Sequence, residues 1–236
     1  MKVNEIFGPT IQGEGKSAGR EVLFLRLALC NLHCVWCDTP HTWNWSGTPF
    51  SHPEKFEKKD EIHEMEIDDI LAALNALSED VRSLVISGGE PLLQQRDLLP
   101  LLVELKARGW WIEIETNGTI APTSEFDEYV DQFNCSPKLA NSGNSVRLRI
   151  HEEALQKLAD NAKVYFKFVV AGEDDVPEVL SFVERYSMER VYLMPLGKTA
   201  EELEETREIV RGIAERLRLQ FTDRLHITLF GGVRGT

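Results

Sequence analysis

Long apolar runs and basic residues are both scarce in this sequence, and each shortage excludes a class of protein. Nowhere in its 236 residues do about 18 consecutive apolar residues occur, as a membrane-spanning helix requires. The stretch MKVNEIFGPTIQGEG also lacks a basic leader followed by an apolar run. Lys and Arg total 26 against 39 Asp and Glu, and the resulting formal charge of -13 repels a phosphate backbone. We therefore expect neither a membrane nor a nucleic acid as a partner.

Cysteine is scarce as well, but its placement is informative. Of the 4 cysteines, all but Cys135 fall within CNLHCVWC at residues 30 to 37. The missing leader favours a cytoplasmic location, where clustered cysteines more often bind metal than form disulfides. With 42% hydrophobic residues the chain can bury one sizeable core. We expect a single cytoplasmic domain over residues 1–236 that carries a metal-binding segment.

Apolar runs that alternate with helical patterns predict the fold. Helical spacing of apolar residues lies between most of the strand candidates, as at 67–77 and at about 200–217. Alternating strands and helices indicate parallel βα units, and closure of eight such units typically takes about 250 residues. We count six units and predict an α/β fold, a partial (βα)6 barrel. The strand candidates are 22–29, 84–87, 110–116, 130–136, 164–170 and 190–195.

One segment interrupts this alternation. Residues 41–66 are rich in Pro, Gly, Ser and charge and show little apolar periodicity. We interpret them as a charged insertion, which either replaces a helix packed on the barrel or forms a dock for a reductase.

Polar or Gly-rich segments follow all six predicted strands. Because the carboxyl ends of parallel strands meet at one edge, we expect these segments to surround a functional cleft. They are the residues from Cys30 onward, SGGEP (87–91), ETNG (115–118), SPK (136–138), AGED (171–174) and PLGK (195–198).

The three clustered cysteines are consistent with two kinds of metal site. A closed zinc site takes four ligands, so Cys30, Cys34 and Cys37 would need a fourth such as His33 or His41. A four-iron cluster also normally takes four thiolates, so three would leave one iron open to a substrate or cofactor. A zinc-stabilised interaction module and an iron–sulfur enzyme are both compatible with this count.

The C-x3-C-x2-C spacing, with Trp36 before the last cysteine and GGEP after the next strand, resembles the radical S-adenosylmethionine (SAM) superfamily. The resemblance implies a 4Fe-4S cluster on Cys30, Cys34 and Cys37, whose open iron chelates SAM and whose reduction cleaves SAM to a 5′-deoxyadenosyl radical. Cys135 is then expected to be a packing thiol, since a fourth ligand would close the open iron. The main alternative enzyme is a glycyl-radical-enzyme activase, which shares this spacing but has little use for IQGEG or Arg26.

Five motifs in order are similar to the 7-carboxy-7-deazaguanine synthase family: FGPTIQGEG (7–15), LRLALCNLHCVWCDT (25–39), SGGEP, ETNG and SPK, with LHITLFGGVRGT at the C-terminus. The similarity implies a lyase that converts 6-carboxy-5,6,7,8-tetrahydropterin to 7-carboxy-7-deazaguanine with loss of ammonia, in queuosine and deazapurine biosynthesis. It also implies abstraction of the C6 hydrogen, a regenerated SAM, Mg2+ as a further cofactor, flavodoxin or a similar reductant as a partner, and a homodimer.

The resemblance assigns roles to individual residues. Arg26, a charge within an apolar strand, is either one half of an ion pair or a fork that grips the substrate carboxylate. With Arg26, Glu115 is implied to be catalytic. The implied substrate-binding residues are Ile11, Gln12, Gly13, Glu14, Arg26, Ser87, Glu115, His226 and Thr236. The implied SAM-binding residues are Trp36, Cys37, Asp38, Gly88, Gly89, Glu90, Ser136, Pro137 and Lys138, and Thr39 is the implied Mg2+ ligand.

Overall fold

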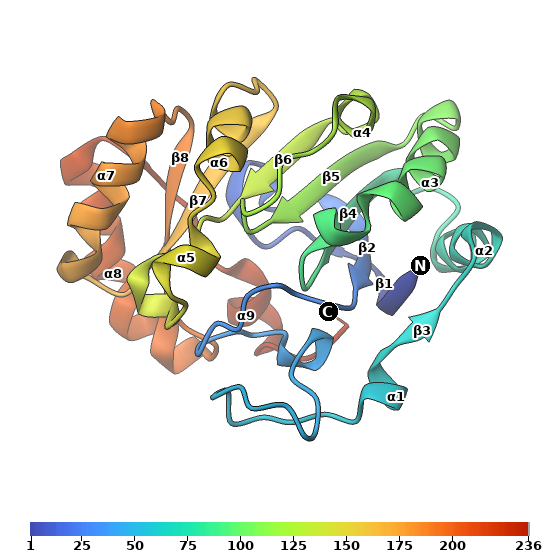
Figure 1. The fold of residues 1–236 in the computed structure, drawn as a ribbon, viewed down its shortest axis with the longest axis horizontal. Coiled ribbons are helices and arrows are strands. Elements are labelled where there is room, and N and C mark those ends of the chain that lie inside the picture. The colour runs from blue at the N-terminus through green and yellow to red at the C-terminus, as the bar shows by residue number, and fades with distance from the viewer. Residues whose placement is uncertain (236) are drawn as a thin grey trace.

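The computed structural model describes residues 1–235, so Thr236, a predicted substrate contact, lies outside the described residues. All strands belong to a 9-stranded sheet with the order β3-β1-β2-β4-β5-β6-β7-β8-β9 (Figure 1). The strands are β1 (Lys2–Ile11), β2 (Glu21–Leu27), β3 (His63–Glu64), β4 (Ser83–Gly88), β5 (Trp111–Thr116), β6 (Gln132–Cys135), β7 (Val164–Val170), β8 (Val191–Pro195) and β9 (Gln220–Phe221).

The parallel part of the sheet confirms the predicted fold. The strands from β2 through β4, β5, β6 and β7 to β8 pair in parallel, each with the next, and they coincide with the six predicted strands. Since β3 and β9 stand at opposite ends of the strand order, the sheet forms a partial barrel that does not close.

The antiparallel strand β1 was not predicted. Its sequence contains Gly8 and Pro9, which normally argue against a strand. The pairing of β1 with β2 accommodates them through a register shift between Phe7 and Thr10. The short strands β3 and β9 were missed as well, because two residues are too few to show a pattern.

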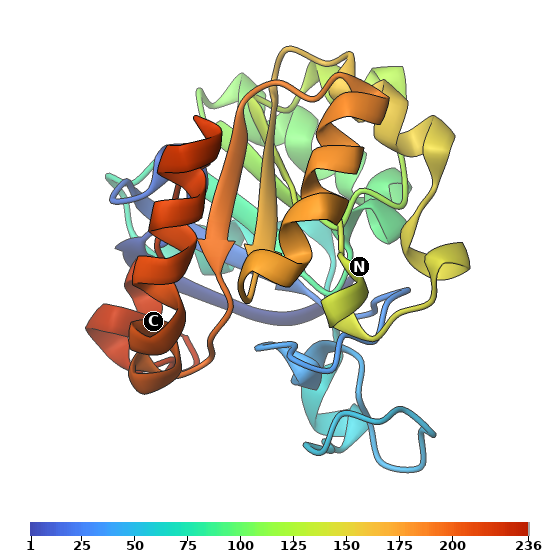
Figure 2. The same cartoon turned by 90° about the vertical axis from the view of Figure 1, so that its left-hand side faces the viewer.

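The longer helices cover one face of the sheet (Figures 1 and 2). Some begin at clear capping residues: Glu66 and Asp69 form a capping box at α2, and Thr199 accepts a hydrogen bond from the backbone N–H of Glu202 at α8. The helices are α1 (Lys58–Glu61), α2 (Ile67–Leu77), α3 (Gln95–Ala107), α4 (Ser124–Glu128), α5 (Val146–Arg149), α6 (Glu152–Ala159), α7 (Val176–Tyr186), α8 (Ala200–Leu217) and α9 (Leu225–Phe230). Within residues 1–235, no helix has the length and apolar character needed to cross a membrane.

Alternation along the strands separates an apolar outer face from a polar inner face. In β5, Ile112 and Ile114 join the hydrophobic core beneath the helices, whereas the intervening Glu113 does not. In β7, Phe166 and Phe168 join the same core, and Lys167 lies between them. Because successive side chains of a strand point to opposite faces, the charged residues share the inner face. The fold therefore places ionisable groups inside the partial barrel.

Residues 41–66, the predicted insertion, form a projection beside the cysteine segment at the lower edge of the view in Figure 2. A single bridge pairs Trp45 with Phe56, and the segment then continues through α1 into β3. Strand β3 pairs with the beginning of β1, where Val3 lies opposite His63. The segment thus returns to the sheet and extends its edge.

Candidate active site

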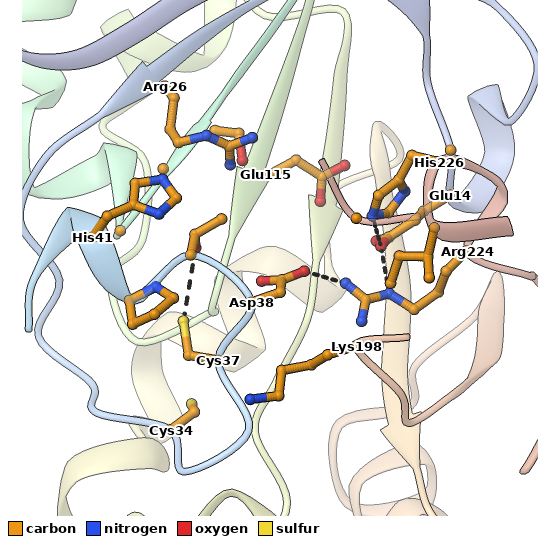
Figure 3. Close-up of a pocket in the computed structure, with 18 of the residues that line it drawn as sticks. Glu14, Arg26, Cys34, Cys37, Asp38, His41, Glu115, Lys198, Arg224 and His226 are labelled. Atoms are coloured by element: carbon orange, nitrogen blue, oxygen red, sulfur yellow. Dashed lines mark hydrogen bonds and ion pairs between the residues drawn. The ribbon is translucent and has the colours of Figure 1, made fainter. Parts of the chain in front are cut away.

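A cavity of about 730 Å³ opens at the carboxyl ends of the parallel strands (Figure 3). Segments after β2, β4, β5, β6 and β8 line it, as predicted, together with the N-terminal loop and the end of the chain. The AGED segment (171–174) is an exception, because β7 contributes Lys167 and Val169 to the lining instead. Most of the predicted site residues line this cavity: Ile11, Gln12, Gly13, Glu14, Arg26, Cys30, Cys34, Trp36, Cys37, Asp38, Thr39, Ser87, Gly88, Gly89, Glu115, Ser136, Lys138 and His226.

Two predicted SAM contacts, Glu90 and Pro137, are not among the lining residues. The carboxylate of Glu90 is fully buried and accepts hydrogen bonds from the Thr116 hydroxyl at 2.8 Å and the Asn117 backbone N–H at 2.7 Å. It also accepts one from the backbone N–H of Leu92 at 3.0 Å. The carboxylate of Glu90 therefore ties two loops together, and its contact with SAM stays a prediction.

The glycine pair before Glu90 also brings two segments of the chain together. The backbone N–H of Gly89 donates to the carbonyl of Leu27 at 3.0 Å. A Cβ atom at Gly89 would lie 1.9 Å from the carbonyl oxygen of Leu29, which no larger residue could tolerate. The glycine thus allows this loop to pack directly against the backbone that leads into the cysteines.

The three clustered cysteines are free thiols on the cavity wall. Burial raises the pKa of Cys34 to about 11, so a bound cation would be needed to hold it as a thiolate at neutral pH. Among residues 1–235, no three His, Cys, Asp or Glu side chains converge as ligands of a single metal ion. Each sulfur accepts an N–H hydrogen bond: Cys30 from Leu32 N at 3.4 Å, Cys34 from Asn144 Nδ2 at 3.3 Å, and Cys37 from Trp43 Nε1 at 3.4 Å.

Cys135 stands apart from this group. It is fully buried in β6 and belongs to the hydrophobic core, on the outer face of the sheet. The expectation that it is a packing thiol is confirmed.

A buried ammonium group organises the carboxylates of the inner face. Lys167 is 1% exposed, and its Nζ lies 2.9 Å from Glu14 Oε2 and 2.7 Å from Glu115 Oε2. Gln12 Nε2 donates to Glu115 Oε1 at 3.0 Å and to Glu113 Oε1 at 2.7 Å. Burial opposes ionisation of Glu14, but Lys167 and Arg224 together hold the pKa of this carboxyl well below its usual range. Glu14 therefore presents a negative charge to the cavity at neutral pH.

Arg224 joins three loops that are distant in sequence. Its Nε donates to Glu14 Oε1 at 3.0 Å, its Nη1 donates to the carbonyl of Gly197 at 2.5 Å, and its Nη2 pairs with Asp38. Figure 3 shows its guanidinium between the carboxylates of Asp38 and Glu14. The N-terminal loop, the cysteine segment and the loop after β8 are thus held together at one side of the cavity.

Sequence reasoning missed both of these cations. Lys167 is the one charge in VYFKFVV, which is the same signal that singled out Arg26 in its own strand. Arg224 lies in a short loop before α9, where an arginine gives no recognisable pattern.

Arg26 forms an ion pair, one of the two readings considered for it, and the grip on a substrate carboxylate stays a prediction. Its Nε donates to Glu5 Oε1 at 2.6 Å, and its guanidinium carbon lies 5.4 Å from the centre of the Phe7 ring. It also lines the cavity, as Figure 3 shows. An ion pair therefore holds the arginine fork at the cavity wall.

The end of the chain returns to the N-terminal loop. The backbone N–H of Leu225 donates to the carbonyl of Gly13 at 3.0 Å. His226 Nε2 lies 4.0 Å from Glu14 Oε1, so α9 closes one wall of the cavity.

The family model described as the Radical SAM superfamily matches residues 27–226. The 7-carboxy-7-deazaguanine synthase of Pyrobaculum aerophilum is 38% identical over 100% of this chain and 97% of its own length. The enzyme of the same name from Halobacterium salinarum is 34% identical over 98% of this chain and 90% of its own. Among solved structures, QueE from Escherichia coli matches with a TM-score of 0.71 and 26% identity, over 95% of this chain and 94% of that one. From this similarity over the full length, the chain belongs to the radical SAM superfamily and, within it, to the 7-carboxy-7-deazaguanine synthase family.

Proposed function

We propose that this chain is a radical SAM lyase that converts 6-carboxy-5,6,7,8-tetrahydropterin to 7-carboxy-7-deazaguanine with loss of ammonia, in the biosynthesis of queuosine and related deazapurines. One observation carries the proposal: the cavity that contains the three thiols is also lined by Gln12, Glu14, Arg26 and Glu115. A cavity of about 730 Å³ with this polar wall suits a small ligand, whereas an activase must admit a protein backbone.

The residues at the mouth of the barrel fit the two cofactors of the superfamily. Cys30, Cys34 and Cys37 would hold the 4Fe-4S cluster, since all three sulfurs line the cavity and each already accepts an N–H donor. When bound, the cluster and SAM supply a 5′-deoxyadenosyl radical that abstracts hydrogen.

SAM would bind beside the cysteines. Trp36, Ser136 and Lys138 form one group there: Lys138 Nζ donates to Ser136 Oγ at 2.8 Å and lies 5.6 Å from the centre of the Trp36 ring. The backbone of Gly88 and Gly89 lines the same wall.

We assign Mg2+ to Thr39, whose hydroxyl lies in the cavity 3.7 Å from the Cys37 sulfur. Magnesium keeps several waters and takes other oxygens from its substrate, so a single protein hydroxyl is a chemically adequate contribution.

The inner face of the barrel complements the substrate. A pterin presents N–H donors and a carbonyl acceptor along one edge, and the Glu14 carboxylate and the Gln12 amide supply the matching groups. Lys167 and Arg224 keep Glu14 ionised, so that it acts only as an acceptor. Arg26 would grip the substrate carboxylate with its planar fork, and Glu115 would orient the reacting carbon.

The sequence and its resemblance to the family support a proposal for the setting of the reaction. We propose that the chain works in the cytoplasm as a single domain over residues 1–236, as a homodimer, with flavodoxin or a similar protein as reductant. Neither a nucleic acid nor a membrane is required for this reaction.

An anaerobic reaction with reconstituted protein, SAM, reductant, Mg2+ and 6-carboxytetrahydropterin tests the proposal by mass spectrometry. Formation of 7-carboxy-7-deazaguanine and ammonia, absent when SAM or the pterin is left out, is the expected result. Formation of 5′-deoxyadenosine alone would overturn the substrate assignment, and its formation only with a protein substrate would favour the activase. With an intact cluster and neither product, the enzymatic assignment would fail.

A further inference from the structure

Part of the insertion forms a cover over the cysteine segment, and we use "cover" for residues 43–56. The ring of Phe50 stacks on His33 with their centroids 3.5 Å apart and 14° between their planes. Phe50 also meets Trp43 edge-on at 5.6 Å. Since His33 lies between two of the cysteines, the cover packs directly on the loop that carries the thiols.

Polar bonds within the cover fix its shape. Asn44 Nδ2 donates to the carbonyl of His52 at 3.0 Å, and Lys55 Nζ donates to Asn44 Oδ1 at 2.7 Å and to the carbonyl of Phe50 at 2.9 Å. The ring of His52 in turn bonds the carbonyl of Cys37 through Nε2 at 3.1 Å. The aromatic rings over the cysteine segment are therefore held in place from both sides.

Within this cover, Trp43 points its only donor at a sulfur. Its side chain is 3% exposed, and Nε1 lies 3.4 Å from the Cys37 sulfur. An indole has a single N–H and no acceptor, so this bond is the whole polar role of the ring.

A second side chain approaches the cysteine segment from another part of the fold. Asn144 lies in the loop before α5, and its Nδ2 is 3.3 Å from the Cys34 sulfur. Its Oδ1 accepts the backbone N–H of His33 at 2.9 Å, which fixes the direction of the amide. Two of the three sulfurs thus receive a side-chain donor, from residues that are far apart in sequence.

We propose that Trp43 and Asn144 are positioning residues that set the reduction potential of the cluster through their N–H···S bonds. Hydrogen bonds to cluster sulfurs stabilise the more negative charge that the sulfurs carry after reduction, and so raise the potential. The inference rests on the 4Fe-4S cluster of the proposed function, but it concerns the cluster alone and not the pterin. It also gives the insertion a role that the reaction chemistry by itself does not require.

The test is a reductive titration of the reconstituted protein with dithionite, without SAM or pterin, followed by electron paramagnetic resonance. Trp43→Phe keeps an aromatic ring against Phe50 and removes the N–H. We expect reduction to become roughly tenfold less favourable, which for a one-electron couple is a shift of about 59 mV to a more negative potential. Asn144→Asp keeps the acceptor for His33 N but replaces the donor with a negative charge. We expect it to lower the potential by more than Trp43→Phe does.

Trp45→Phe is the matched control. Its indole nitrogen is also buried in the cover but has no hydrogen-bond partner among residues 1–235. We expect its potential to equal that of the unaltered protein.

Iron and sulfide content are measured for each variant before the titration. A loaded Trp43→Phe with an unchanged potential would overturn the inference. So would failure of Trp43→Phe to hold iron while Trp45→Phe holds it, since Trp43 would then be needed for assembly of the site. If the unaltered protein holds no four-iron cluster, the proposed function itself fails and the inference with it.

Discussion

The Nζ of Lys167 lies 2.7 Å from Glu115 Oε2, and this ammonium group is 1% exposed inside the barrel. A buried charge is costly unless it is paired, and here Glu14 supplies a second partner at 2.9 Å. The lysine therefore connects the N-terminal loop to the end of β5. Both carboxylates of the proposed substrate site pair with this cation, which itself lines the cavity.

Replacing that cation should cost both stability and binding. Lys167→Met leaves Glu115 without a counter-ion and Glu14 with Arg224 alone, and breaking such a buried pair typically costs about 3–5 kcal/mol. We expect this loss in the free energy of unfolding from chemical denaturation, and weaker pterin binding by calorimetry. Lys163→Met is the control, because Lys163 is 35% exposed and its pair with Asp127 should contribute about 0–1 kcal/mol. Equal stability of the two variants would contradict the role of Lys167.

The dependence of stability on pH should reveal the ionised state of Glu14. Burial alone would raise the pKa of this carboxyl, but Lys167 and Arg224 lower it in the folded protein. Its contribution to stability is then present above the unfolded pKa of about 4.3 and is lost as pH falls through the folded pKa. We expect Glu14→Gln to flatten the curve of unfolding free energy against pH below about pH 4.3. Glu104→Gln, which alters an exposed pair on α3, should follow the unaltered protein.

The sequence predicted the parallel strands well because their outward residues form apolar runs, as with Phe166 and Phe168. It also located most of the cavity, since the ends of parallel strands must meet at one edge. It could not pair Lys167 with Glu14 or Arg224 with Asp38, because those contacts join segments that only the curvature of the sheet brings together.

Glu90 shows what a sequence pattern leaves undecided. It sits next to two glycines at a strand end, where a cofactor contact and a structural cap have the same sequence signature. Its carboxylate makes the bonds of a cap, to Thr116 and Asn117. Only the direction of the side chain separates the two roles, and a one-dimensional pattern does not contain it.

Arg26→Lys should separate substrate binding from cluster chemistry. A lysine can keep a charge beside Glu5, but a point charge cannot reproduce the planar fork that grips a carboxylate from two nitrogens. We expect an intact cluster and normal SAM binding, with a KM for the pterin raised about 10-fold or more, in line with the loss of one charge-assisted bond. Arg20→Lys makes the same substitution at a surface arginine that contacts Trp111, and it serves as the matched control. An unaltered KM would remove Arg26 from the substrate site.

Alanine variants of the four cysteines can be compared for their ability to hold the cluster. Cys30→Ala, Cys34→Ala and Cys37→Ala should each lose the cluster and all activity, because each removes one of the thiolates available to the iron. Cys135→Ala should keep its iron and its absorption spectrum, since that sulfur lies in the core on the outer face of the sheet. Iron and sulfide analysis after anaerobic reconstitution measures the outcome. Loss of the cluster in Cys135→Ala, in a variant that still unfolds cooperatively, would be incompatible with three-thiolate ligation.

Arg234 connects the end of the chain to Glu61 and to Glu5 of β1. Its Nη2 lies 2.7 Å from Glu61 Oε2 and its Nε lies 3.1 Å from Glu5 Oε2, while the neighbouring Gly232 and Gly235 line the cavity. Arg234→Ala should free this wall and raise the KM for the pterin more than it lowers kcat, because the segment lines the cavity and carries none of the proposed catalytic groups. Arg216→Ala, which removes an exposed pair with Glu173, should leave both constants unchanged. Steady-state kinetics at saturating SAM distinguish the outcomes. Matching KM values for the two variants would mean that the chain end does not close the cavity. A fall in kcat alone would place Arg234 closer to the reacting atoms than its contacts with Glu61 and Glu5 imply.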